Sequence, residues 1–152
     1  MLVAAILAVM IAIQTATGTP ASSDRKTLAG NWMVAVDLIT PPPGVPPHFL
    51  SLQTYIEDGT LLEETNTSRV RSLAHGKWER VSRRQFTRSW LFFRFDVSRN
   101  FIGTSKNTAT ITLNEDGNEF RVTEATVELF DAAGNLISRT SDAGGTEVGT
   151  RL

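Results

Sequence analysis

The 152-residue chain has no cysteine, which excludes a disulfide framework, a thiol nucleophile, a cysteine-ligated zinc site and a lipid-modified N-terminal cysteine. His48 and His75 are the only histidines, so a three-histidine metal site within one chain is excluded as well. Neither sign of charge is in excess, because 15 Lys and Arg stand against 16 Asp and Glu. That balance is unlike the basic footprint of a nucleic-acid binder. We therefore predict no metal site, no cofactor and no nucleic-acid partner.

The familiar catalytic motifs are also missing. The chain contains no G-x-S-x-G turn, no Walker loop, no H-E-x-x-H helix and no G-x-G-x-x-G after a strand. Its composition, with 41% hydrophobic and 20% charged residues, is that of an ordinary globular protein, and its length suits one domain. The sequence predicts a single folded domain more clearly than it predicts an activity.

The N-terminal segment has the pattern of a secretory signal. Leu2–Ile13 is wholly apolar and is followed by small and polar residues, with possible cleavage after Gly18 or Ala21. No Lys or Arg precedes Arg25, so the charged start of such a signal is missing. The apolar run is too short to cross a bilayer, which takes about 20 residues. A membrane anchor and a buried helix remain the alternatives.

We expect residues 1–21 to be a signal peptide and residues 22–152 to form one domain. The mature protein would then be secreted or periplasmic, with no stable membrane span after cleavage. The remaining chain is long enough to bury one hydrophobic core. Its oligomeric state is left open by the sequence.

The rest of the chain shows no long stretch with helical periodicity. Short runs rich in β-branched and aromatic residues alternate instead with turn signals, which is typical of an all-β protein. The predicted strands are Trp32–Ile39, Phe49–Glu57, Thr60–Asn66, Gly76–Ser82, Gln85–Asp96, Phe101–Asn114, Glu119–Phe130 and Leu136–Arg139. We expect Thr146–Leu152 to continue or complete the last of them.

The turns favour sequential antiparallel pairing. Asp58-Gly59 and Asp116-Gly117 are strong hairpin signals. The step from Asp96 to Ile102 repeats the step from Asp131 to Ile137, which indicates one turn design used twice. A meander of about eight strands leaves two exposed edges unless it closes. We predict an eight-stranded antiparallel up-and-down barrel, with room for side chains or one small ligand, and keep a sandwich as the alternative.

Strand alternation gives expectations about faces. On Phe101–Asn114 it places Phe101 inward and Ile102 toward solvent. On the preceding strand we expect Arg88 to point outward and leave Arg94 undecided. The proline-rich Pro41–Pro47 cannot be a central strand, and we interpret it as a stiff connector across one end of the barrel in preference to a lid.

Two sets of residues are candidates for a site. The weak catalytic candidates are Glu63, Glu64 and His75, because one of two adjacent carboxylates faces inward and could pair with the histidine as an acid–base couple. A structural role is the favoured interpretation of His75. The candidate ligand contacts are aromatic residues and one arginine: Tyr55, Trp78, Trp90, Phe92 and Arg94. Sequence does not distinguish aromatics that line a pocket from aromatics that fill a core.

Gly30-Asn31-Trp32 opens the first strand and Arg151 ends the last. This resembles the lipocalin or calycin pattern, in which the Trp packs beneath the Arg and closes one end of the barrel. The resemblance implies structural roles for Trp32 and Arg151. Four further motifs make the chain similar to a group of small exported bacterial proteins with a lipocalin-like barrel: Pro42–Pro47, Asp58-Gly59-Thr60, His75-Gly76-Lys77-Trp78 and Gly149-Thr150-Arg151.

The function expected from these observations is binding of a small, largely apolar molecule inside an exported barrel. One alternative is a small cyclase or isomerase that uses Tyr55 and the carboxylate and histidine candidates, and we lean against an enzyme. The other alternative is a solid-core structural domain without a ligand. In that case Trp78, Trp90 and Phe92 would fill the interior.

Overall fold

The computed structural model describes residues 26–41, 44–67, 69–141 and 145–152, so the predicted signal peptide lies outside the described residues. These residues form nine antiparallel strands and no helix. The strands are β1 (Gly30–Leu38), β2 (His48–Tyr55), β3 (Thr60–Thr65), β4 (Ala74–Arg80), β5 (Gln85–Phe95), β6 (Phe101–Leu113), β7 (Glu119–Phe130), β8 (Leu136–Ser141) and β9 (Gly145–Arg151). Within the described ranges, no helix has the length and hydropathy needed to cross a membrane.

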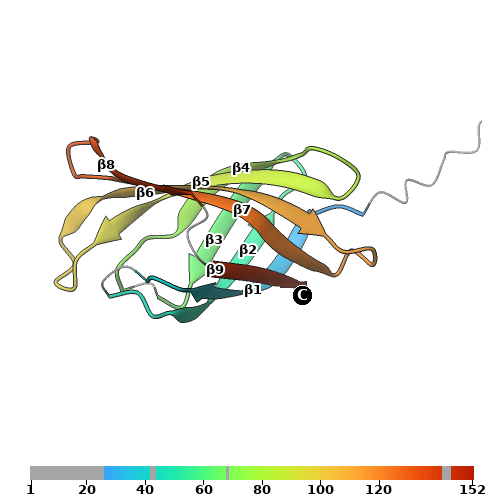
Figure 1. The fold of residues 1–152 in the computed structure, drawn as a ribbon, viewed down its shortest axis with the longest axis horizontal. Coiled ribbons are helices and arrows are strands. Elements are labelled where there is room, and N and C mark those ends of the chain that lie inside the picture. Colours follow the sequence, from blue (N-terminus) through green and yellow to red (C-terminus); the bar gives the residue numbers. More distant parts are fainter. Residues whose placement is uncertain (1–25, 42–43, 68, 142–144) are drawn as a thin grey trace, which may run out of the picture.

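Eight of the strands close into a barrel (Figure 1). Each of β1 to β7 pairs with the next strand in the sequence, and β9 lies between β7 and β1 to complete the circle. Closure satisfies the backbone groups that the outer edges of β1 and β7 would otherwise expose. The predicted all-β, eight-stranded antiparallel barrel is therefore confirmed, and the sandwich alternative is not.

The strand that completes the barrel is β9, and not the Leu136–Arg139 strand that we predicted as the eighth. β7 is long enough for two partners on one edge: its start, Glu119–Arg121, pairs with β9, and its end, Thr126–Phe130, pairs with β8. The residues of β8 are all exposed, and this strand lies beyond the barrel wall at the far left of Figure 1. Thr146–Leu152 accordingly belongs to a separate strand.

The two turns predicted to share one design do share it. In Asp96–Asn100 the backbone N–H of Asp96 donates to the Asn100 carbonyl at 2.9 Å, and the Asn100 backbone donates to the Asp96 carboxylate at 2.8 Å. In Asp131–Asn135 the corresponding distances are 2.9 and 2.8 Å. The residue before each asparagine has positive φ, 66° at Arg99 and 88° at Gly134. The side-chain amide of each asparagine also donates to its aspartate, at 2.9 and 3.0 Å, and these amide bonds, with the backbone N–H bonds to the carboxylates, lower the pKa of Asp96 and Asp131.

A bulge between β5 and β6 reverses our face assignment at the start of β6. Arg94 pairs with Gly103 but Phe95 pairs with Phe101, so Ile102 is an extra residue. Gly103 has φ +131°, and a Cβ there would lie 2.0 Å from a backbone oxygen of β7, so only glycine fits. The inserted residue turns Ile102 toward the interior and Phe101 outward, against the alternation read from sequence.

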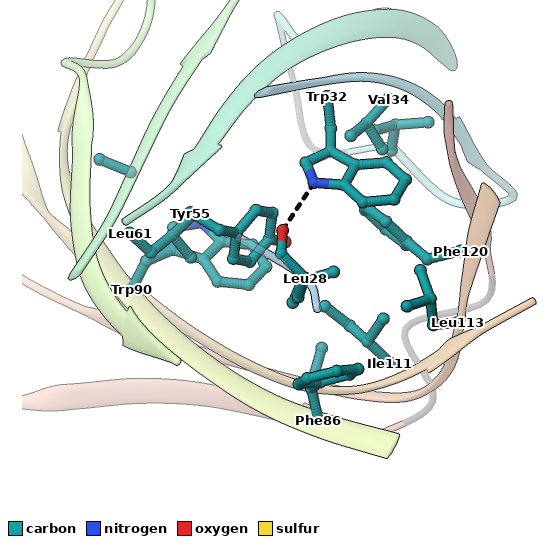
Figure 2. Close-up of a cluster of buried hydrophobic side chains, with 13 residues drawn as sticks. Leu28, Trp32, Val34, Tyr55, Leu61, Phe86, Trp90, Ile111, Leu113 and Phe120 are labelled. Atoms are coloured by element: carbon teal, nitrogen blue, oxygen red, sulfur yellow. Dashed lines mark hydrogen bonds between the residues drawn. The ribbon is translucent and has the colours of Figure 1, made fainter. Parts of the chain in front are cut away.

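One end of the barrel is packed solid with apolar side chains (Figure 2). Trp32 and Phe120 are fully buried and meet edge to face, with ring centroids 4.9 Å apart. Leu28 precedes β1 and inserts among Phe86, Ile111 and the indole of Trp32. Its carbonyl accepts a 2.8 Å hydrogen bond from the Trp32 indole N–H, so the buried donor is satisfied.

Arg151 covers this closed end from outside. Its guanidinium carbon lies 4.3 Å from the centroid of the Trp32 ring, a cation–π arrangement. The same guanidinium donates to the carbonyl oxygens of Gly117 at 2.9 Å, Ala29 at 2.8 Å and Thr27 at 2.6 Å. One side chain therefore ties the last strand to the β6–β7 turn and to the segment before β1.

We expect Trp32→Ala to lower the free energy of unfolding by about 3–5 kcal/mol, because it empties the centre of the packed end. Chemical denaturation followed by circular dichroism measures the loss. Leu62→Ala, on the outer face of β3, is the control and should cost far less, since Leu62 is 37% exposed. A loss for Trp32→Ala well under 1 kcal/mol would contradict closure of the barrel at this tryptophan.

Candidate ligand-binding cavity

Beyond the packed end, the barrel interior opens into a cavity of about 390 Å³. Its apolar lining comes from β1, β2, β5, β6, β7 and two connecting segments: Val36, Leu38, Val45, Phe49, Val70, Trp90, Phe92, Phe95, Ile102, Val127 and Leu129. Val45 belongs to the proline-rich loop, so the described part of that loop lies at this end of the barrel, as predicted. The volume falls within the range of about 300–1,000 Å³ usual for small-molecule sites.

Arg88 lies between the packed end and the cavity, and our expectation that it faces solvent is wrong. The residue is 1% exposed, and its guanidinium donates to Gln53 Oε1 at 2.6 Å and to the Tyr55 hydroxyl at 2.8 Å. It also forms an ion pair with Glu147 of β9. Arg88 points inward because it shares one face of β5 with aromatic side chains that must be buried.

A second buried ion pair extends this arrangement across the interior. Arg71, in the segment before β4, pairs with Glu63 of β3. Ser51 donates to Glu63 at 2.9 Å and accepts from the Gln53 amide at 3.3 Å, which joins the two ion pairs. We call Ser51, Gln53, Glu63, Arg71, Arg88 and Glu147, with the hydroxyl of Tyr55, the polar layer. Because Glu63, Arg71 and Glu147 also line the cavity, the polar layer forms its floor.

Burial and charge act in opposite directions within the polar layer. Burial by itself would lower the pKa of Arg88, but Glu147 and Tyr55 outweigh it and raise that pKa overall, so the guanidinium stays charged. Burial raises the pKa of Tyr55 to about 12, although Arg88 acts to lower it. The hydroxyl is therefore neutral at ordinary pH, and it donates to Gln53 Oε1 at 2.6 Å.

The structure places three of the five candidate ligand contacts on the cavity. Trp90, Phe92 and Arg94 line it from β5. Tyr55 and Trp78 do not: their rings meet edge to face at 6.0 Å beneath the polar layer, and the Trp78 indole donates to the Ile56 carbonyl at 2.8 Å.

Two lining aromatics also stack with cations of the polar layer. The guanidinium carbon of Arg88 lies 4.2 Å from the Trp90 ring centroid, and that of Arg71 lies 3.6 Å from the Phe92 ring centroid. These contacts hold one face of each aromatic ring against the floor.

The weak catalytic candidates are not brought together. Glu63 is buried and already paired with Arg71, whereas Glu64 and His75 are exposed on the outer face. His75 pairs across the sheet with Leu62, which points to the opposite side from Glu63. Among the described residues, no group of three or more His, Asp or Glu side chains could hold a metal ion.

Sequence reasoning missed most of the polar layer. Ser51 and Gln53 face inward while Leu50 and Leu52, on the same strand, face outward, which is the reverse of the usual hydrophobic pattern. The usable signal was Tyr55, whose alternation with Gln53 and Ser51 puts all three on one face. Glu147 and Arg71 carried no local signal.

Comparisons with known proteins add no information about the site. No protein-family model, curated protein sequence or solved structure matches this chain. The functional argument therefore depends on the cavity, the polar layer and the motifs of the sequence.

Glu147→Gln should lower the free energy of unfolding by about 3 kcal/mol, because it leaves the buried Arg88 charge without its carboxylate. Denaturant unfolding measures the change. The matched control is Glu115→Gln, whose partner Arg84 is 3.5 Å away and whose side chain is 88% exposed, so little change is expected. Equal effects of the two substitutions would contradict the proposed importance of the buried pair. Combining Glu147→Gln with Arg88→Met should recover much of the loss, since no buried charge then remains unpaired.

Tyr55 is the only tyrosine, so the ultraviolet absorbance of its phenolate reports directly on the polar layer. We expect half-ionisation near pH 12 in the folded protein, against about 10 after unfolding. Because the unfolded state loses this proton first, the contribution to stability is complete below pH 10 and is lost as pH rises toward 12. Tyr55→Phe should lack this part of the pH dependence. A midpoint near 10 while circular dichroism still shows folded protein would contradict the burial of the hydroxyl.

Proposed function

We propose that this chain is an exported, lipocalin-like barrel that binds a small, largely apolar molecule in its interior. The observation that carries the proposal is the asymmetry of the interior. One end is packed solid around Trp32, and the other holds a cavity of about 390 Å³ with an apolar wall. A barrel of eight strands is wide enough for such a cavity only where its inward side chains leave room.

Small inward side chains on β6 leave that room. Gly103, Ser105 and Ala109 point inward along this strand, where they pair with the larger Arg94, Phe92 and Arg88 of β5. Farther toward the closed end, the inward positions of β6 become Ile111 and Leu113, and the interior is filled. The change from small to large residues along one strand thus accounts for a barrel that is open at one end and solid at the other.

The two alternatives have less support. A solid-core domain would need Trp90 and Phe92 to fill the interior, but both line the cavity. A cyclase or isomerase would need an acid–base pair, but Glu63 is held by Arg71 and His75 is exposed on the outer face. No observation favours either alternative over binding.

Export and the relation to lipocalins rest on the sequence motifs. The apolar Leu2–Ile13 with its small-residue continuation supports export. The arrangement of Trp32 beneath Arg151 at a closed barrel end supports the lipocalin-like assignment.

The test is mass spectrometry of protein purified from the exported fraction of its native cells. We expect an organic extract to contain one small molecule in stoichiometric amount, and the intact mass to correspond to cleavage after Gly18 or Ala21. Val127→Trp, which fills the cavity from β7, should carry no such molecule, whereas Val81→Trp on the exposed β4–β5 turn should carry it as the wild type does.

The proposal would be overturned if the wild type yielded no small molecule and also failed to bind the neutral apolar probe N-phenylnaphthylamine. Circular dichroism of both variants is needed alongside, since a loss of ligand is informative only in folded protein.

A further inference from the structure

The charges around the cavity do not balance. Glu63 pairs with Arg71 and Glu147 pairs with Arg88. Arg94 also lines the cavity, but in the described part of the chain no carboxylate lies within ion-pair distance of it. Three arginines and two glutamates leave an excess of one positive charge at the floor and wall of an otherwise apolar site.

The hydrogen-bond donors around the cavity are in excess as well. Three buried donors have no hydrogen-bond partner among the described residues: the Nε–H groups of Arg88 and Arg94 and the indole N–H of Trp90. Trp90 itself is only 5% exposed. A buried donor left without an acceptor is destabilising, and a ligand acceptor that enters the site removes this cost.

The negative charges of the described lining are already paired with arginines. Both carboxylates are in ion pairs, and Asn107 Oδ1 accepts from Ser105 at 2.9 Å. Among the described lining residues, a positively charged ligand would find no carboxylate that is not already paired with an arginine. The site complements a ligand with a negative charge and acceptor oxygens.

Position on β5 indicates how such a ligand lies. Trp90, Phe92 and Arg94 share the inward face of one strand, so Phe92 lies between two of the unpartnered donors, those of Trp90 and Arg94. Of these three residues, Arg94 lies nearest the end of β5. It is next to the bulge, and its backbone forms an isolated antiparallel bridge with Arg71.

We propose that the ligand is an amphiphilic monoanion, a carboxylate or sulfonate with an apolar body, whose anionic oxygens accept from Arg94 while the body lies against Phe92 and Val127. This inference rests on the proposed function, since it names the chemical class of the molecule held in the same cavity. A charge-assisted hydrogen bond in a buried site contributes enough for about a tenfold preference or more over a neutral analogue.

The experiment uses two fluorescent probes that differ by one group: anilinonaphthalene sulfonate, an anion, and N-phenylnaphthylamine, which lacks the sulfonate. We expect the wild type to bind the anion at least about tenfold more tightly. Val127→Trp should abolish binding of both probes, which establishes that they occupy the cavity. Dodecanoate should displace the anionic probe at lower concentration than dodecanol does.

Arg94→Gln should weaken binding of the sulfonate by about tenfold and leave the neutral probe unchanged. Arg121→Gln is the matched control: it removes the same charge from the outer face of β7, where the side chain is 66% exposed, and should change neither affinity. If Arg94→Gln fails to fold, Arg94→Met tests the same point, because it removes the charge while keeping an unbranched apolar stem, and it should also lose the preference for the anion.

Three results would overturn the inference. Equal binding of the two probes by the wild type would be consistent with the proposed function but would contradict a preference for an anionic ligand. Equal weakening of both probes in folded Arg94→Gln would show that Arg94 shapes the cavity and does not hold a charge. Binding of neither probe would overturn the inference, and together with an extract that contains no small molecule it would overturn the proposed function as well.

Discussion

Closure of the sheet by β9 is the constraint on which both halves of the interior depend. Seven residues at the end of the chain pair with β1 along most of its length and with the start of β7. This pairing brings Arg151 over Trp32 at the packed end. It also brings Glu147 to Arg88, 59 residues away in the sequence, in the polar layer. The packed end and the floor of the cavity are therefore both built by one strand joining two edges that would otherwise stay open.

Much of the fold was predictable because its signals are local. The ends of the strands follow turn residues, and Asp96–Asn100 and Asp131–Asn135 carry their own hydrogen-bonding groups. The exchange of roles between β8 and β9 was not predictable. It depends on which part of the β7 edge each strand pairs with: β9 pairs with the start of β7, and β8 pairs with its end, which extends past the barrel wall. The sequences of β8 and β9 themselves do not indicate which part of β7 each will meet.

The site was harder to predict than the fold for the same reason. Trp90, Phe92 and Arg94 were candidates because three aromatics and two arginines alternate along β5, and that same alternation requires Arg88 to face inward once the aromatics are buried. Its partners Glu147, Gln53 and Tyr55 come from two other strands, so no spacing in the sequence connects them. The bulge at Gly103 likewise reverses a face through one inserted residue, which a strict period of two does not reveal.

Both ends of the described chain emerge at the same pole of the barrel. Residues 26–29 run beneath Trp32, and the backbone of Leu152 donates to Asn31 beside them, with the C-terminus at the right of Figure 1. The cavity opens at the opposite pole. A carrier, label or solid support attached at either end would therefore hold the molecule by its base, and the opening would face away from the attachment. Fusion proteins could be made from this barrel without redesigning its connectivity.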